Sequence, residues 1–150
     1  MRLNHVALAV KDMERSLTFY RDALGLTVAQ DEVIAGPDLD RAVMEKGARI
    51  RMVMLVDEAG TMIELLGWQS RPVRERPPDD LKFTSTGLVE VCLQVSDLKK
   101  VESDLKRKGF DGFRTPVWNF GNVSPSYDGP EAKITHVVDP DGVQVELVQV

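Results

Sequence analysis

The chain is 150 residues long, 43% of them hydrophobic, and carries a formal net charge of −5. This length suits one compact unit with enough apolar residues for a core, and the charge argues against nucleic acid or an anionic membrane as a partner. No apolar run approaches the roughly 20 residues of a membrane span, and no secretory signal is visible at the N-terminus. Cys92 is the single cysteine, which excludes an internal disulfide and favours a reducing compartment. We therefore expect a cytoplasmic protein.

Elements of the first half follow from apolar periodicity. Residues 3–10 alternate as a strand, and Asp12 is suited to cap a helix that runs to a glycine cap at Gly25. The segment 35–47 reads as a loop that can hold a helical turn. Three more strands are expected, at residues 26–34, 49–56 and 61–67.

The second half is expected to repeat this plan after a proline-bearing connector. Asp97 is suited to cap a helix that ends at Gly109, and the turn-rich segment 119–130 could form a mobile lid. The strands are expected at residues 88–95, 112–118, 132–138 and 143–150. We expect one domain over residues 1–150, made of module one (1–67), a connector (68–86) and module two (87–150).

Two segments of the first half recur in the second half, which indicates an internal repeat. One match has an offset of 82 residues and places Glu64 on Glu146; the other has an offset of 85 and places His5 on Glu90. The matched segments are 57–66 with 139–148 and 3–12 with 88–97. The chain is therefore predicted to be two βαβββ modules.

The four matched polar residues are candidate metal ligands. Alternation places His5 and Glu90 opposite the helix-facing side of their strands. If a pseudo-twofold axis relates the modules, His5, Glu64, Glu90 and Glu146 can converge near it. A hard or borderline divalent cation takes such oxygen and imidazole ligands.

The repeat plan resembles the vicinal oxygen chelate superfamily, which includes glyoxalase I, methylmalonyl-CoA epimerase, extradiol dioxygenases and bleomycin-binding proteins. The resemblance covers nearly the whole chain and is carried by four segments: Leu3–Val10, Ser16–Leu26, Met62–Leu66 and Asp139–Leu147. It implies an α+β fold of paired βαβββ modules, whose eight strands curl around a metal or ligand cup. It also implies a homodimer. His5, Glu64 and Glu146 match the family's ligand positions.

Glu90 departs from the family pattern, because close relatives usually have histidine there. Glu90 allows three interpretations: a fourth metal ligand, a general base beside the metal, or a decayed metal site that leaves a binding pocket. One nitrogen and three carboxylates would favour Mn²⁺, Mg²⁺ or a similar ion. The identity of the metal (Mn, Mg, Ni, Zn, Co or Fe) stays open.

The expected function is a metal-dependent isomerase, epimerase or lyase acting on a small oxygenated substrate. A divalent ion that chelates two substrate oxygens stabilises an enolate or enediolate, and a nearby side chain can move the proton. Glu90, Glu146 and His136 are the expected catalytic residues. His136 aligns with Met54 rather than with a ligand position, so a strand histidine or a pocket wall is the favoured interpretation. An iron-dependent extradiol dioxygenase is less favoured, because the second histidine is missing.

A metal-free ligand-binding or drug-binding protein, similar to the bleomycin-resistance proteins, is the alternative function. Its aromatic walls would suit a flat cationic ligand. Candidate pocket residues for either function are Trp68, Trp118, Phe120 and Tyr127.

Overall fold

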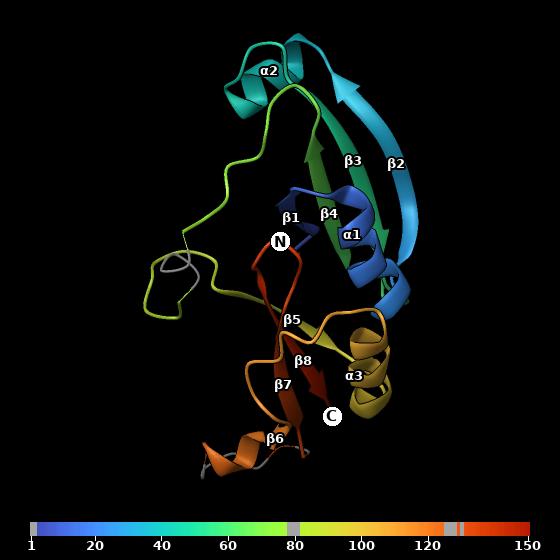
Figure 1. The fold of residues 1–150 in the computed structure, drawn as a ribbon, viewed down its shortest axis with the longest axis vertical. Helices are drawn as coiled ribbons and strands as arrows, with labels where there is room; N and C mark the ends of the chain where they lie inside the picture. Colours follow the sequence, from blue (N-terminus) through green and yellow to red (C-terminus); the bar gives the residue numbers. More distant parts are fainter. Residues whose placement is uncertain (1–2, 78–81, 125–128, 130) are drawn as a thin grey trace. The chain divides into compact units, whose positions relative to one another are not determined.

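The computed structural model describes residues 3–77, 82–124, 129 and 131–150. The chain divides into two compact units, Met1–Glu75 and Arg76–Val150 (Figure 1). Each unit contains a four-stranded mixed sheet. Two expectations lie partly or wholly outside the described residues. They are the pocket residue Tyr127 and, in the expected lid, residues 125–128 and 130.

The first unit is a sheet with strand order β1-β4-β3-β2. β1 runs parallel to β4, and the other neighbours are antiparallel. Its elements are β1 (His5–Val10), α1 (Met13–Leu17), a π-helical turn (Thr18–Ala23), β2 (Thr27–Ala35), α2 (Pro37–Val43), β3 (Arg49–Val56) and β4 (Met62–Trp68).

The second unit repeats this topology, with strand order β5-β8-β7-β6 and a parallel β5–β8 pair. Its elements are β5 (Glu90–Gln94), α3 (Leu98–Arg107), β6 (Trp118–Asn119), a 3-10 turn (Phe120–Asn122), β7 (Lys133–Val138) and β8 (Gln144–Gln149). The α+β class with a repeated βαβββ order is thus confirmed.

Strand alternation gives each sheet one apolar face and one face with polar groups. In the second unit Val137, Val145 and Leu147 are fully buried, whereas the intervening His136 and Glu146 point to the opposite face. In the first unit Val53, Leu55 and Leu65 are fully buried in the same way. The apolar residues therefore fix which side chains are left to form a site.

The helix after the first strand of each unit begins as the sequence predicts. The Asp12 carboxylate accepts the Arg15 amide hydrogen at 3.1 Å, and the Asp97 carboxylate accepts that of Lys100 at 3.0 Å. The helix extends to Ala23, as expected, and Gly25 follows it with a positive φ of 85°. Its second part, however, is a π-helical turn rather than an α-helix. The wider turn accommodates Phe19 and Tyr20, adjacent aromatic residues that are both fully buried.

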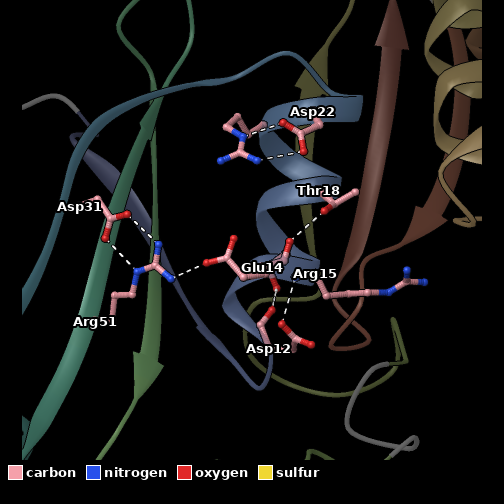
Figure 2. Close-up of polar contacts among 9 residues, drawn as sticks. Asp12, Glu14, Arg15, Thr18, Asp22, Asp31 and Arg51 are labelled. Carbon is pink, nitrogen blue, oxygen red and sulfur yellow. Dashed lines mark hydrogen bonds and ion pairs between the residues drawn. The ribbon is translucent and has the colours of Figure 1, made fainter.

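Arg51 connects α1 to the sheet of the first unit. Figure 2 shows its guanidinium, on β3, between Asp31 of β2 and Glu14 of α1. It donates two hydrogen bonds to Asp31, at 2.9 and 2.7 Å, and one to Glu14 at 2.6 Å. The Arg51 guanidinium holds the pKa of Asp31 below its usual range through these hydrogen bonds.

A repeated turn introduces the last strand of each unit. Asp57 accepts the Thr61 amide hydrogen at 2.8 Å, and Asp139 accepts those of Asp141 and Val143 at 2.9 and 2.7 Å. The glycine three positions after each aspartate has a positive φ, 82° at Gly60 and 89° at Gly142. A residue with a Cβ adopts this conformation only with backbone strain. The same turn thus positions Glu64 and Glu146 on their strands.

The strand expected over residues 112–118 is wrong. Only an isolated bridge between Phe113 and Val137 and the two-residue β6 form there. The backbone still bonds to β7, since the Arg114 amide donates to the His136 carbonyl at 2.9 Å. Pro116 has no amide hydrogen with which to continue such a ladder.

Candidate metal centre

Three potential metal ligands of the second unit lie on one face of its sheet. His136 of β7 and Glu146 of β8 are directly opposite in the register. On the other side of β8, Glu90 of β5 pairs with Gln144, two residues before Glu146, so its side chain points to the same face. One potential ligand atom from each lies within 4.8 Å of the others.

An imidazole nitrogen stands between the two carboxylates. His136 Nε2 lies 3.5 Å from Glu90 Oε2 and 3.3 Å from Glu146 Oε2. The His136 side chain is 11% exposed, and those of Glu90 and Glu146 are 26% and 20% exposed. The cluster is therefore largely enclosed, with solvent access mainly at the carboxylates.

The His136 ring is held from its other side. Its Nδ1 lies 3.5 Å from Thr115 Oγ1, and the Thr115 hydroxyl accepts the His136 backbone N–H at 3.3 Å. Trp118 stacks on the imidazole with ring centroids 6.4 Å apart and an interplanar angle of 14°. Phe83 meets the same ring edge-on at 6.2 Å. These neighbours orient Nε2 toward the carboxylates.

Cys92 holds Glu146 in place. It is opposite Glu146 in the β5–β8 register, and its thiol donates to Glu146 Oε1 at 2.9 Å. The residue is exposed as a whole, yet partial burial of the thiol and the hydrogen bond to Glu146 raise the pKa of Cys92 to about 12. The thiol therefore stays protonated at neutral pH and acts as a donor.

Glu90 is the cluster member with unused hydrogen-bonding capacity. Its Oε2 atom is buried and has no hydrogen-bond partner among the described residues. A buried carboxylate oxygen without a partner is costly. A cation is one group that would satisfy it.

The first unit carries a smaller pair at the equivalent place. His5 Nε2 lies 3.6 Å from Glu64 Oε2, and His5 Nδ1 lies 2.8 Å from Asn4 Oδ1. Ala7 and Met54 flank Glu64 in the register, where Cys92 and His136 flank Glu146 in the second unit. The two units therefore share a topology but differ in the number of donor groups.

The four ligands expected from the sequence fall in two pairs. The structure brings Glu90 and Glu146 together in the second unit, and His5 and Glu64 in the first. A single site made of all four stays a prediction. The sequence repeat gave no ligand signal for His136, because Met54 occupies the equivalent position. A signal lay in the strand register, which sets His136 opposite Glu146.

The expected pocket residues are also divided between the units. Trp118 and Phe120 of the second unit stack at 6.3 Å, and Trp118 extends the stack to His136. In the first unit, the guanidinium carbon of Arg71 lies over the Trp68 ring, 5.9 Å from the centroid of that ring. Aromatic rings therefore flank the cluster of the second unit.

These features define a class of protein: paired βαβββ units, each with a carboxylate beside an imidazole on the open face of its sheet. The family model described as Glyoxalase/Bleomycin resistance protein/Dioxygenase superfamily matches residues 2–147, and the chain belongs to this superfamily. None of the helices in the described parts of the chain is long and apolar enough to cross a membrane.

Similar proteins include two named epimerases. The chain is 32% identical to mouse (Mus musculus) mitochondrial methylmalonyl-CoA epimerase, with 99% of this chain and 72% of that protein covered. It is also 32% identical to the ethylmalonyl-CoA/methylmalonyl-CoA epimerase of Cereibacter sphaeroides, with 99% and 98% covered. A glyoxalase family protein of Bacillus cereus has a similar fold, with a TM-score of 0.82, 17% identity, and 99% and 93% covered.

Proposed function

We propose that this protein is an epimerase that acts, with a divalent cation, on a small oxygenated substrate such as a substituted malonyl thioester. The observation that carries the proposal is the cluster of Glu90, His136 and Glu146 on one sheet face. The similarity to epimerases over 99% of the chain supports the reaction type. Of the expected isomerase, epimerase and lyase activities, we therefore favour epimerisation.

The proposed reaction inverts one carbon. In a substituted malonyl thioester, the carbon that carries the acidic hydrogen lies between a carboxylate and a thioester carbonyl. A basic side chain removes the proton, and the C–H electron pair moves onto the thioester oxygen to give an enolate. A protonated side chain on the other side of the enolate then returns a proton to the opposite face of the carbon. The product therefore has the same atoms as the substrate. Such acid–base help contributes about 10²–10⁴-fold to a rate.

The donor groups suit a divalent cation. Carboxylate oxygens and imidazole nitrogens are common ligands of Mn²⁺, Zn²⁺, Co²⁺ and Fe²⁺. When bound, the cation would stabilise the negative charge that develops on the substrate oxygens. The ligand set His5, Glu64, Glu90 and Glu146 and the acid–base set Glu90, Glu146 and His136 overlap.

A metal-free binding protein is the second candidate function. The specific observation in its favour is the aromatic stack of His136, Trp118 and Phe120. A flat ligand can extend such a stack. This candidate requires neither a cation nor proton transfer, which makes it separable by experiment.

We also propose a cytoplasmic homodimer. The nine-residue strand β2 ends one sheet, and no strand in the described part of the chain pairs with its outer edge. An exposed edge is a common place for a partner strand to pair. Sedimentation of the protein at micromolar concentration tests the dimer, and a monomer there would exclude it.

Deuterium exchange tests the proposed activity. The full chain is loaded with Mn²⁺, Co²⁺ or Zn²⁺ and incubated in heavy water with one stereoisomer of methylmalonyl-CoA. We expect deuterium at the carbon between the two carbonyl groups, together with loss of stereochemical purity. Glu146→Gln should lower the exchange rate by about 100-fold or more, whereas the exposed Glu131→Gln should exchange like the unmodified protein.

Two results would count against the epimerase. Exchange no faster than in buffer, with every metal tried, would exclude it for this substrate. Equal exchange rates in Glu146→Gln and Glu131→Gln would separate any activity from the cluster. A tight aromatic ligand bound without metal would then favour the binding protein.

A further inference from the structure

We infer that the first unit binds the nucleotide end of a coenzyme A thioester, with Trp68 as the stacking surface and Arg71 as a phosphate-binding residue. This inference rests on the proposed function, because it names the thioester substrate of that reaction more closely. Coenzyme A joins the thioester, through a long flexible arm, to an adenosine nucleotide with several phosphate groups. An enzyme that recognises the whole molecule therefore needs a second binding site at a distance from the reacting carbon.

Trp68 and Glu64 lie on the same face of the first sheet. Both belong to β4 and are four residues apart, so strand alternation places them on one side, about 13 Å apart along the strand. Gly67 faces α1, because a Cβ there would lie 3.1 Å from the end of the Met13 side chain. Trp68 therefore points to the open face that carries Glu64, and it is half-buried there.

The sheet face between these two residues is apolar. Leu66 is the intervening β4 residue on this face, and it pairs with Ala9 of β1 on one side and with Met52 of β3 on the other. Ala7 and Ala9 of β1 have small side chains and are exposed. Apolar surface suits the uncharged arm of coenzyme A, and the small alanine side chains let such an arm approach the backbone closely.

Arg71 presents a guanidinium over the indole of Trp68. The guanidinium carbon lies 5.9 Å from the centroid of the indole ring, and Arg71 Nη1 lies 2.7 Å from Glu45 Oε1. Arg71 and Glu45 are 44% and 42% exposed, and an ion pair this exposed is weak. A phosphate can therefore replace Glu45 as the partner of Arg71, since the flat fork of N–H donors fits phosphate oxygens. The indole beside it offers a surface on which a purine base can stack.

Other cationic side chains lie at the same end of the sheet. Lys11 follows the last residue of β1, at the end where β4 reaches Trp68, and it pairs with Glu75. Arg49 begins β3 at this end and donates to the Gln69 side chain at 3.0 Å. Clustered lysine and arginine side chains attract a phosphate-bearing ligand even where the protein as a whole is negative, as this one is at −5.

The repeated fold does not require an indole at position 68. The repeat offset of 82 residues matches Trp68 to Val150, and β8 forms its pairs with this aliphatic residue directly after its end. Val150 is 56% exposed, so the matching position of the second unit adds little to its core. The Trp68 side chain is therefore available for binding a ligand.

Binding of adenosine 3′,5′-bisphosphate to the full chain tests this site directly. The compound carries the nucleotide of coenzyme A without the arm and the thioester. Isothermal titration at low and high salt measures its affinity for the unmodified protein and for Trp68→Ala, Arg71→Ala and Arg71→Lys. Arg107→Gln is the matched control, because Arg107 is also exposed and pairs with a carboxylate, that of Asp104.

Trp68→Ala should weaken binding by about 5–100-fold, the usual effect of losing one stacking ring. Arg71→Ala should weaken it by about 10-fold or more. Arg71→Lys should restore only part of the affinity, because lysine keeps the charge but not the flat fork. Added salt should weaken binding, and Arg107→Gln should bind like the unmodified protein. Circular dichroism verifies that the variants are folded, and the exposed Arg71 supplies a second variant if Trp68→Ala is not.

Exchange kinetics distinguish the nucleotide of the substrate from a free nucleotide. The deuterium-exchange assay is run with methylmalonyl-CoA and with the methylmalonyl thioester of N-acetylcysteamine, which lacks the nucleotide. In the unmodified protein kcat/KM should be higher for the coenzyme A thioester. Trp68→Ala and Arg71→Ala should reduce this advantage by about 10-fold or more. The loss should appear in KM rather than in kcat, because the nucleotide takes no part in the reaction.

Three outcomes would overturn the inference. They are no binding of the bisphosphate at millimolar concentration, unchanged affinity in folded Trp68→Ala and Arg71→Ala, and an equal rise of KM for both thioesters. Binding as expected with no exchange of either thioester would instead contradict the proposed function alone. Exchange of methylmalonyl-CoA with an unchanged KM in both variants would contradict this inference alone.

Discussion

His136 of β7 faces Glu146 of β8, with 3.3 Å between Nε2 and Oε2. The equivalent pair in the first unit is Met54 and Glu64. The second unit therefore has an imidazole directly opposite the β8 carboxylate, where the first unit has a thioether opposite the β4 carboxylate. With Glu90 beside it, the second unit acquires a set of donor groups that the first unit lacks.

Cys92 should matter for metal affinity rather than as a nucleophile. Its thiol donates to Glu146 and has a pKa raised to about 12, so it orients the carboxylate and does not attack. Cys92→Ala copies Ala7 of the first unit, and we expect it to weaken Co²⁺ binding by about 10–100-fold. Titration calorimetry measures this change. Unchanged affinity would show that Glu146 needs no such support.

Asp31→Asn should destabilise the first unit modestly. The Asp31 side chain is 38% exposed, so the loss of its ion pair with Arg51 should cost at most about 1 kcal/mol. Urea denaturation measures this difference. Glu32→Gln, on the same strand, is the control and should be nearly neutral.

The same pair predicts a pH dependence. Hydrogen bonds from Arg51 lower the pKa of Asp31 from its ordinary value of 3.8. The pair is therefore fully stabilising above about pH 4, and this contribution is lost as the pH falls through the lowered pKa. The stability difference between unmodified protein and Asp31→Asn should shrink as the pH is lowered from 6 to 3. A difference that grew on acidification would contradict this assignment.

Asp139 should contribute more to stability than Asp57, its counterpart in the first turn. Asp139 is 5% exposed and accepts two backbone amide hydrogens, whereas the hydrogen bond to Thr61 is the one found for the Asp57 side chain. We expect a loss of about 3 kcal/mol for Asp139→Ala and about 1–2 kcal/mol for Asp57→Ala. Chemical denaturation of both variants measures this order, and equal losses would contradict it.

Much of the fold could be predicted because its signals are local. Asp12 and Asp97 mark helix starts, and alternation of apolar residues marks the strands and their faces. The repeat of the Asp57 turn at Asp139 revealed the two modules. The π-helical turn could not be predicted, because it depends on how Phe19 and Tyr20 enter the core together.

The sequence predicted only part of the candidate site. Glu90 and Glu146 were expected from repeat positions, and the structure places them in one cluster. The contribution of His136 to this cluster depends on which residues face each other across β7 and β8. The turn between β7 and β8 sets this register, so the signal lies in the hairpin and not in the alignment of one module on the other.

A crystal structure of the protein with Co²⁺ or Zn²⁺ would test the account most directly, because anomalous scattering locates the ion. The account predicts one ion per chain, with oxygen atoms of Glu90 and Glu146 among its ligands at about 2.0–2.2 Å. An ion bound away from both of these carboxylates, or no ion at the cluster despite saturating metal, would contradict it.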